Sequence, residues 1–252
     1  MCVILHVERK LNVECACDIY NIQISRVTQY LFGFNVNPSN SEIFDISYVC
    51  GQQSNTFFSS NPTMKARCDL KEGGGWTVIL RRNSDAVPHV NFRRIWSDYE
   101  NGFGNLSTEF WYGLRNIHCL TTREPVDLRI ELKQSAGTQV WTYREFVVDG
   151  AHNNYTLHIG RAHGQSEGEK FDAMAIHNGM QFTTKDVDND KYSSNCAVGG
   201  WWYNTCGYSR LTSPHTGDWV INWHTPGRNS NYYPYVEMKV RPKGCNPNGT
   251  CK

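Results

Sequence analysis

The sequence predicts an α+β fold with a central twisted antiparallel sheet, short helices and a loop-rich C-terminal region. Residues 128–132, 155–159 and 235–240 alternate apolar and polar side chains, which is the period of a strand with one buried face. From residue 160 the regular pattern fades for about 70 residues, and loops of that length are usually functional. We expect the last strand, after this loop region, to return to the central sheet.

The other elements can be placed in chain order. Residues 1–45 show no firm period, and a glycine-rich turn later leads into an expected strand at 76–80. A second helix is expected over 108–118, although Gly113 disfavours it, and a further strand over 140–148. A first helix is expected before the helix at 108–118. It is indicated by apolar residues at i, i+3, i+4 and i+7: Phe92, Ile95, Trp96 and Tyr99.

Length and charge limit the classes of function. The 252 residues suffice for one large domain or two small ones, and the net charge is +1. Because the Lys and Arg residues are scattered, no basic surface for nucleic acid is expected. No run of about 18 apolar residues occurs, so no membrane-spanning helix is expected.

The cysteine content indicates an oxidising compartment. Ten cysteines favour disulfide bonds and a secreted, extracellular protein, whereas only Cys15 and Cys17 approach zinc-site spacing, one residue too close. Three glycosylation sequons, at Asn105, Asn154 and Asn248, weakly support a secreted glycoprotein. The first ten residues do not resemble a signal peptide, which predicts an upstream start or a fragment.

Three acidic residues, Asp186, Asp188 and Asp190, alternate on a polar loop ahead of a cysteine. Carboxylates at this spacing suit a hard cation with oxygen ligands, above all Ca²⁺, and the alternative is a solvated acidic turn. An EF-hand is not predicted, because Lys191 and Ala197 stand where that motif requires Gly and Glu.

Several motifs occur in one order over residues 46–243. They are Cys68-Asp-Leu70, Gly73-Gly-Gly-Trp-Thr-Val78, Trp96-Ser-Asp-Tyr99, Gly102-Phe-Gly-Asn-Leu106, Glu109-Phe-Trp-Tyr-Gly-Leu114, His177-Asn-Gly-Met-Gln-Phe182, residues 186–197 and Val236-Glu-Met-Lys-Val-Arg-Pro242. On these motifs the sequence resembles the fibrinogen C-terminal (fibrinogen-related) domain family. The lectin-like members, ficolins and tachylectins, look nearest. The resemblance implies that family's fold over 46–243, preceded by an N-terminal segment of unclear structure (1–45) and followed by a C-terminal tail (244–252).

The resemblance implies a calcium loop. Asp188 and Asp190 would supply carboxylates, Tyr192 and Ser194 backbone carbonyls, and water the remaining ligands. Two formal charges on an open loop suit weak binding, with Kd of roughly 10⁻⁴ to 10⁻³ M. Asp186 is expected to support or cap this loop from outside the ligand set.

The resemblance also implies a disulfide bond between Cys196 and Cys206, which would hold the calcium loop against a ligand pocket. Cys68 matches a bridged cysteine of the family, and Cys50 is favoured as its partner over the two cysteines further upstream. The remaining cysteines have weaker assignments. Cys119 stands where relatives have leucine and is expected to be a buried free thiol. Two could close the C-terminal tail, and three could link chains into an oligomer: Cys245 with Cys251, and Cys2, Cys15 and Cys17.

In the lectin-like members an acetyl group sits in an aromatic cup beside the second cysteine of this bridge. A cis peptide bond before that cysteine turns a backbone N–H toward the sugar, and here the bond would be Thr205–Cys206. Gly207 stands where those lectins often have His, and the loop closed by the bridge is about three residues shorter than theirs. Tyr232 and Tyr233 could supply the walls of the cup or could be packing residues.

These features favour a secreted, calcium-binding domain of lectin type that binds N-acetylated or related glycans in innate defence. The alternative is a domain of matrix, clotting or receptor-ligand type that binds extracellular proteins without sugar. An enzyme is not predicted, because no His stands in a Ser/Cys-His-acid or HExxH pattern. His177 is expected to satisfy buried backbone groups instead.

Overall fold

The computed structural model describes residues 42–46, 64–69, 76–163, 171–215, 220–224 and 231–243. The predictions for Cys2, Cys15, Cys17, Cys50, Cys245, Cys251 and Asn248 lie outside these residues. The protein divides into two compact units, Met1–Val78 with Arg241–Lys252, and Ile79–Val240.

The first unit contains strands that the sequence did not indicate. β1 (Glu42–Ile46) pairs antiparallel with β2 (Met64–Asp69), which pairs in turn with the first residues of β3 (Trp76–Asn83). Cys68, expected in a turn, is a fully buried strand residue paired with Thr77. The guanidinium of Arg241 lies 4.3 Å from the ring centroid of Trp76, which covers the ring with a cation.

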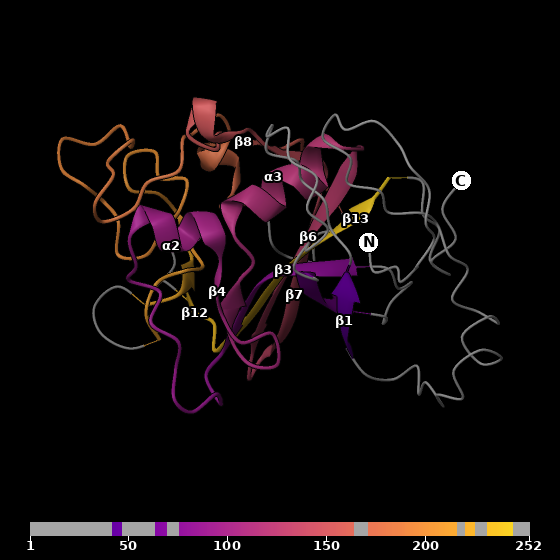
Figure 1. Ribbon diagram of the computed structural model, residues 1–252. Coiled ribbons are helices and arrows are strands. Elements are labelled where there is room, and N and C mark those ends of the chain that lie inside the picture. Colours follow the sequence, from indigo (N-terminus) through magenta and orange to yellow (C-terminus); the bar gives the residue numbers. More distant parts are fainter. Residues whose placement is uncertain are drawn as a thin grey trace, which may run out of the picture. The chain divides into compact units, whose positions relative to one another are not determined.

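The second unit is built on one antiparallel sheet (Figure 1). Along the sheet the strand order is β3, β13 (Tyr235–Pro242), β6 (Val126–Gln134), β7 (Gly137–Val148) and β8 (Leu157–His158). Short strands lie off this path: β5 (Phe110–Trp111) pairs with β3, β4 (Phe103–Gly104) pairs with β5, and β9 (Ala162–His163) pairs with β7. The expected return of the last strand is confirmed, because β13 lies between β3 and β6.

The β6–β7 hairpin is the longest pairing in this sheet. Gln134 faces Gly137 across a two-residue turn, and the turn leaves Gly137 with φ of 135°. Leu128, Ile130 and Leu132 are fully buried on alternate positions of β6. Burial of each such aliphatic residue contributes about 1.5–3 kcal/mol, so the alternation that predicted this strand also fixes its register.

Both helices begin later than predicted. α2 spans Trp96–Asn101, because the preceding segment is held in another way: the Tyr99 hydroxyl donates to the Phe92 carbonyl at 2.7 Å. α3 spans Leu114–Thr122, because Gly113 has φ of 97° and cannot be helical. The residues before Gly113, expected in the helix, form β5 instead.

The strand expected at 155–159 is shortened to β8. Asn154 and Tyr155 have φ of 46° and 51°, so the backbone turns after η1 (Ala151–Asn153) before it can extend. The following loop region holds η2 (Ala175–His177) and a separate small sheet of three antiparallel strands: β10 (Ser209–Arg210), β11 (Asn222–Trp223) and β12 (Asn231–Tyr232).

A cluster of buried rings joins this loop region to α2. The Phe182 ring packs against Tyr99, Trp111 and Trp202 with centroids 5.1–5.8 Å apart. The indole N–H of Trp111 donates to the Tyr99 carbonyl, and that of Trp202 to the Tyr155 carbonyl, both at 2.8 Å. These rings fix both ends of the predicted calcium loop. None of the helices in the described part of the protein has the length and apolar character to cross a membrane.

Candidate functional site

The loop from 181 to 207 is held at its base by backbone pairing. Thr183 and Trp201 exchange two hydrogen bonds, at 2.9 and 3.0 Å. Two amide side chains then brace the loop from inside: Asn189 donates to the Phe182 carbonyl at 2.7 Å, and Asn195 to the Thr184 carbonyl at 2.9 Å. These hydrogen bonds give the loop a defined shape.

Asp186 caps a helix. One of its carboxylate oxygens accepts the backbone N–H of Trp96, the first residue of α2, at 2.9 Å and the Thr184 hydroxyl at 2.8 Å. A carboxylate at a helix N-terminus satisfies an unpaired N–H and interacts favourably with the helix dipole. Asp186 thus has the capping geometry expected from the sequence.

Asp188 and Asp190 lie close together. The Asp190 carboxylate accepts N–H groups from Tyr192 at 2.8 Å and Cys196 at 2.9 Å, and Asp188 accepts the N–H of Asp190 at 3.3 Å. Burial raises the pKa of Asp190 and the charge of Asp188 raises it further, more than these hydrogen bonds lower it. Within the described residues no ion pair joins either carboxylate to a cationic side chain. Two close carboxylates and exposed backbone form an all-oxygen donor set that fits Ca²⁺.

The predicted disulfide bond between Cys196 and Cys206 is confirmed, with a Cα–Cα distance of 5.1 Å. The N–H of Lys191 donates to the Asn204 carbonyl at 2.9 Å and ties the calcium loop to the other side of this ring. Cys68 is also disulfide-bonded. The expectation of a free thiol at Cys119 was wrong, because Cys119 is disulfide-bonded as well. Pairing depends on which cysteines meet in space, and sequence spacing does not reveal this.

Gly207, which was predicted to line the ligand pocket, packs against the buried ring of His177. Gly207 has φ of 115°, and a Cβ there would lie 2.3 Å from Cε1 of His177. The His177 ring is fully buried; its Nδ1–H donates to the Trp202 carbonyl at 2.6 Å, and Nε2 accepts the N–H of Ser209 at 3.3 Å. Burial lowers the pKa of His177 to about 4, so the ring is neutral at pH 7. Its expected role, satisfying buried backbone, is confirmed.

The residues proposed for an acetyl cup do not come together. Val87–Pro88 is the cis peptide bond of the described residues, and the Thr205–Cys206 bond is trans. Tyr233 is buried, and its hydroxyl donates to Gln139 at 3.0 Å. Tyr232 lies on β12, and β11 lies between β12 and β10, the strand that follows Gly207. Two strand spacings place β12 about 9–10 Å from β10. Tyr233 is therefore a packing residue, whereas Tyr232 is partly exposed and its hydroxyl lies 3.0 Å from Nδ1 of His215.

A surface aromatic group lies directly after Gly207. The Tyr208 ring, 37% exposed, stacks on His224 with centroids 5.3 Å apart and meets the edge of Phe171 at 5.1 Å. We call these three residues the Tyr208 stack. A separate cleft of about 470 Å³ is lined in part by Asp172 and Asn178. Their polar atoms already serve the fold, because Asp172 accepts the Tyr143 hydroxyl and Asn178 accepts the N–H of Ile159.

The two described sequons differ in accessibility. Asn105 is exposed, and its side-chain oxygen accepts the N–H of Ser107 at 2.8 Å within a turn. Asn154 is partly buried and donates to Gln181 at 3.2 Å. Glycosylation at either position stays a prediction.

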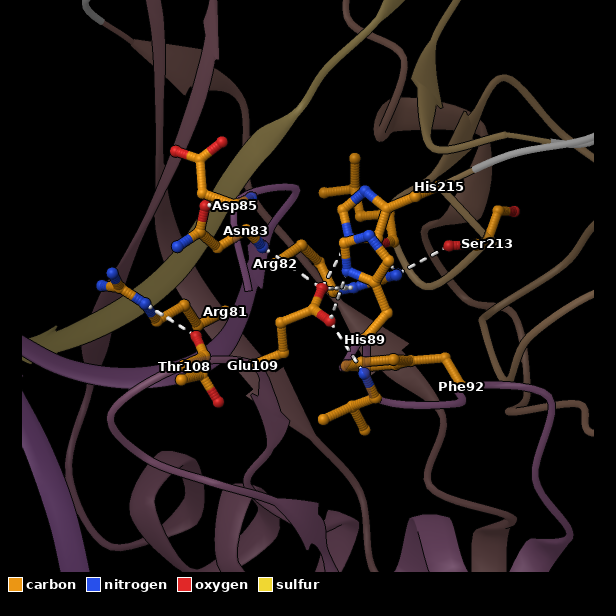
Figure 2. A network of polar contacts seen from close by, with 12 residues as sticks. Arg81, Arg82, Asn83, Asp85, His89, Phe92, Thr108, Glu109, Ser213 and His215 are labelled. Carbon is orange, nitrogen blue, oxygen red and sulfur yellow. Dashed lines mark hydrogen bonds and ion pairs between the residues drawn. The ribbon is translucent and has the colours of Figure 1, made fainter. Parts of the chain in front are cut away.

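The most extensive polar network is centred on Glu109 (Figure 2), which is fully buried immediately before β5. One carboxylate oxygen accepts Arg82 at 3.0 Å and His215 at 2.6 Å, and the other accepts the N–H of Val90 at 2.9 Å and lies 3.4 Å from Nδ1 of His89. Burial alone would raise the pKa of Glu109, but the hydrogen bond from His215 and the charge of Arg82 hold it at about 2.

Sequence reasoning did not find this network. Its members are separated by up to 133 positions (82 to 215) and match no spacing motif. Glu109 occurs in a family motif and Arg82 follows the strand expected at 76–80, but nothing in the order of residues indicates that two histidines meet that pair. A contact between a buried Glu and a buried Arg could have been suspected from the sequence. The contact of this pair with the two histidines could not.

Known families and proteins match most of the sequence. The family described as fibrinogen beta and gamma chains, C-terminal globular domain, matches residues 47–243. Fibrinogen-like protein A of Apostichopus parvimensis is 40% identical over 190 residues, which are 71% of this chain and 64% of that protein. Tenascin-R of Homo sapiens is 36% identical over 188 residues, 71% of this chain but 13% of tenascin-R. The present protein thus spans less than two thirds of these relatives.

Solved structures agree with the predicted fold. The fibrinogen-like globe domain of human ANGPTL2 matches with a TM-score of 0.67 at 34% identity, covering 81% of this chain and 93% of that one. Lamprey fibrin D-dimer, complexed with the peptide Gly-His-Arg-Pro-amide, matches with a TM-score of 0.67 at 28% identity, covering 81% of this chain and 70% of that one. The particular likeness to ficolins and tachylectins is not supported, because these relatives are fibrinogen-like, tenascin and angiopoietin-related proteins.

Proposed function

Because this protein belongs to the family of C-terminal globular domains of fibrinogen beta and gamma chains, we propose that it is an extracellular protein-recognition domain and not a lectin. An extracellular setting is supported by the disulfide bond Cys196–Cys206 and by disulfide-bonded Cys68 and Cys119, since such bonds persist in oxidising compartments. The relatives support binding to proteins, because they include tenascin-R and angiopoietin-related protein 2.

The packing of Gly207 on His177 carries the choice against sugar. A glycan pocket needs a concave site with polar groups directed into it. Here the space beside Gly207 is taken by the neutral ring of His177, whose two nitrogens are bonded to backbone.

The Tyr208 stack is the proposed contact for the partner. Tyrosine supplies a large, rigid and amphipathic contact surface and is enriched at protein interfaces. Tyr208 follows the disulfide ring directly, so its position is fixed by Cys206 on one side and by β10 on the other. The proposed function is binding alone, and no step of catalysis is assigned to any residue.

Calcium is proposed as a brace for this face. Asp188 and Asp190 would hold the ion with the carbonyls of Tyr192 and Ser194. The ion would offset the repulsion between the two carboxylates and rigidify the loop that is clamped to Cys206. It would not contact the partner.

A paired binding assay tests the choice between protein and sugar. The whole protein, in 2 mM Ca²⁺, is applied to an array of N-acetylated glycans and to a display library of extracellular proteins. We expect no glycan to bind and a protein to bind. Tyr208→Ala should weaken that protein at least about tenfold, as truncation of an aromatic interface anchor does. Val87→Ala, at a side chain that is 90% exposed and lies outside both the stack and the calcium loop, should bind like wild type.

The proposal is wrong if N-acetylated glycans bind with a signal that chelator removes. It is equally wrong if Tyr208→Ala and Val87→Ala bind the captured protein alike. The melting temperature of each variant, measured in the same buffer, shows that a loss of binding is not a loss of fold.

A further inference from the structure

We propose that His89, Glu109 and His215 form a binding site for a late first-row divalent cation such as Zn²⁺. Their ligand atoms all lie within 4.8 Å of one another. The three come from three separate segments: the loop after β3, the residue before β5 and the loop after β10. In Figure 2 the imidazole rings of His89 and His215 lie against each other, and the Glu109 carboxylate lies beside both.

The donor set determines which ion fits. Two imidazole nitrogens and one carboxylate oxygen, with a fourth position left for water, form the ligand set of many zinc sites. Imidazole favours Zn²⁺, Cu²⁺ and Ni²⁺, whereas Ca²⁺ and Mg²⁺ require oxygen. This site therefore shares neither its ion nor any residue with the predicted calcium loop.

The geometry is close to a coordination shell. In a tetrahedral site with bonds of 2.0–2.1 Å, neighbouring ligand atoms lie about 3.3 Å apart. Nδ1 of His89 lies 3.4 Å from Glu109, and Nε2 of His215 lies 2.6 Å from it. The two rings stack with centroids 4.5 Å apart, so one must turn to direct its nitrogen at a shared ion. His89 can do so, because its side chain is 42% exposed while that of His215 is 4% exposed.

His215 has an outer partner suited to metal binding. Nδ1 of His215 lies 3.0 Å from the Tyr232 hydroxyl, while its Nε2–H donates to Glu109. When Nε2 binds a cation it must give up that proton, and Nδ1 then carries the ring's N–H. A hydroxyl can donate to a nitrogen or accept from an N–H, so Tyr232 serves both tautomers. Metal-bound histidines usually have such a partner, which fixes the ring.

Arg82 sets the limit on affinity. Its guanidinium bonds Glu109 but also the carbonyls of Leu211 at 3.2 Å and Ser213 at 2.6 Å, and lies over the Phe92 ring at 3.9 Å. These contacts hold Arg82 in place, so its charge cancels that of Glu109. The ion would then bind through Oε2, on the side facing His89, and more weakly than in a site with a net negative charge.

Zinc titration calorimetry on the whole protein, stripped with chelator and returned to Ca²⁺-containing buffer at pH 7.4, tests the site. We expect one Zn²⁺ per protein molecule. His89→Gln, an exposed change, should weaken binding at least about tenfold, and Tyr232→Phe about tenfold while the fold is kept. His158→Gln is the matched control, because His158 is 49% exposed and pairs with Asp149 at 2.9 Å but has no third ligand.

Substitution with Co²⁺ gives a second readout that does not depend on stability. A four-coordinate Co²⁺ site with nitrogen and oxygen ligands should give visible absorption bands in wild type and His158→Gln and lose them in His89→Gln. The site is refuted if wild type takes up no Zn²⁺. It is also refuted if His89→Gln and His158→Gln weaken binding equally, which would mean that the histidines are surface ligands only.

Discussion

Glu109 and the pair Asp188 and Asp190 are carboxylates in opposite circumstances. Glu109 is fully buried, yet its pKa is held at about 2, because Arg82, His215 and a backbone N–H all face it. Asp190 is only partly buried, yet its pKa is raised, since its burial and the charge of Asp188 outweigh two backbone donors. Burial therefore does not decide whether a carboxylate is stable as an anion. The partners that the fold supplies decide it.

The largest expected effect comes from removing the Glu109 charge. Glu109→Gln leaves Arg82 buried without a counter-ion and should lower the free energy of unfolding by about 3–5 kcal/mol. Asp98→Asn is the control, since Asp98 forms an exposed i,i+4 pair with Arg94 at 3.5 Å and should cost less than about 1 kcal/mol. Urea unfolding at pH 7 measures both. Equal losses would show that the Glu109 network contributes nothing special to stability.

The pH dependence of stability separates Glu109 from His177. The pKa of His177 is about 4 in the folded protein, below the ordinary value of 6.5, because burial disfavours the charged ring. Above pH 6.5 the ring is neutral in both the folded and the unfolded protein, so its burial carries no charge penalty. As pH falls from 6.5 to 4, the unfolded protein binds a proton that the folded protein does not, which lowers the free energy of unfolding by roughly 3 kcal/mol. Glu109, with its pKa lowered from 4.5 to about 2, loses its contribution only between pH 4.5 and 2.

Urea unfolding of wild type and His177→Gln at pH 7, 5.5 and 4.5 checks this order. His177→Gln should be less stable at pH 7 but should lose less stability than wild type on acidification to pH 4.5. A wild-type slope in His177→Gln would contradict the assignment of this window to His177.

A smaller effect is expected at Gly207. Gly207→Ala places a Cβ 2.3 Å from the His177 ring at φ of 115° and should cost about 1–3 kcal/mol. Gly179→Ala is the matched control, because Gly179 also has a positive φ, 76°, but has no atom within 4 Å of the added Cβ. Thermal unfolding of the two variants separates the cost of the positive φ, which both share, from the cost of the contact with His177, which only Gly207→Ala has. If both variants lose the same stability, His177 does not fill the space beside Gly207.

The same contrast explains what the sequence could predict. The predicted calcium loop and the Cys196–Cys206 bond lie within 21 consecutive residues (186–206), so local spacing and family motifs could predict both, and the bond is confirmed. The hairpin of β6 and β7 was predictable because alternation is local. Two features depend on partners far along the sequence and were not predictable: the packing of His177 on Gly207 and the meeting of His89 with His215. Gly113 already disfavoured the helix expected over 108–118, and its positive φ excludes a helix that begins before it.

The smallest expected effect is the response to calcium, and it is the sharpest test of the comparison. For Kd of roughly 10⁻³ to 10⁻⁴ M, 1 mM Ca²⁺ should stabilise wild type by about 0.4–1.4 kcal/mol. Asp188→Asn removes a ligand and also the repulsion of Asp190. In chelator it should therefore be at least as stable as wild type, the opposite of Glu109→Gln, and it should not respond to Ca²⁺. Asp186→Asn, which weakens only the cap of α2, should lower stability slightly in both buffers and keep the calcium response. A calcium response retained in Asp188→Asn would mean that the ion binds elsewhere.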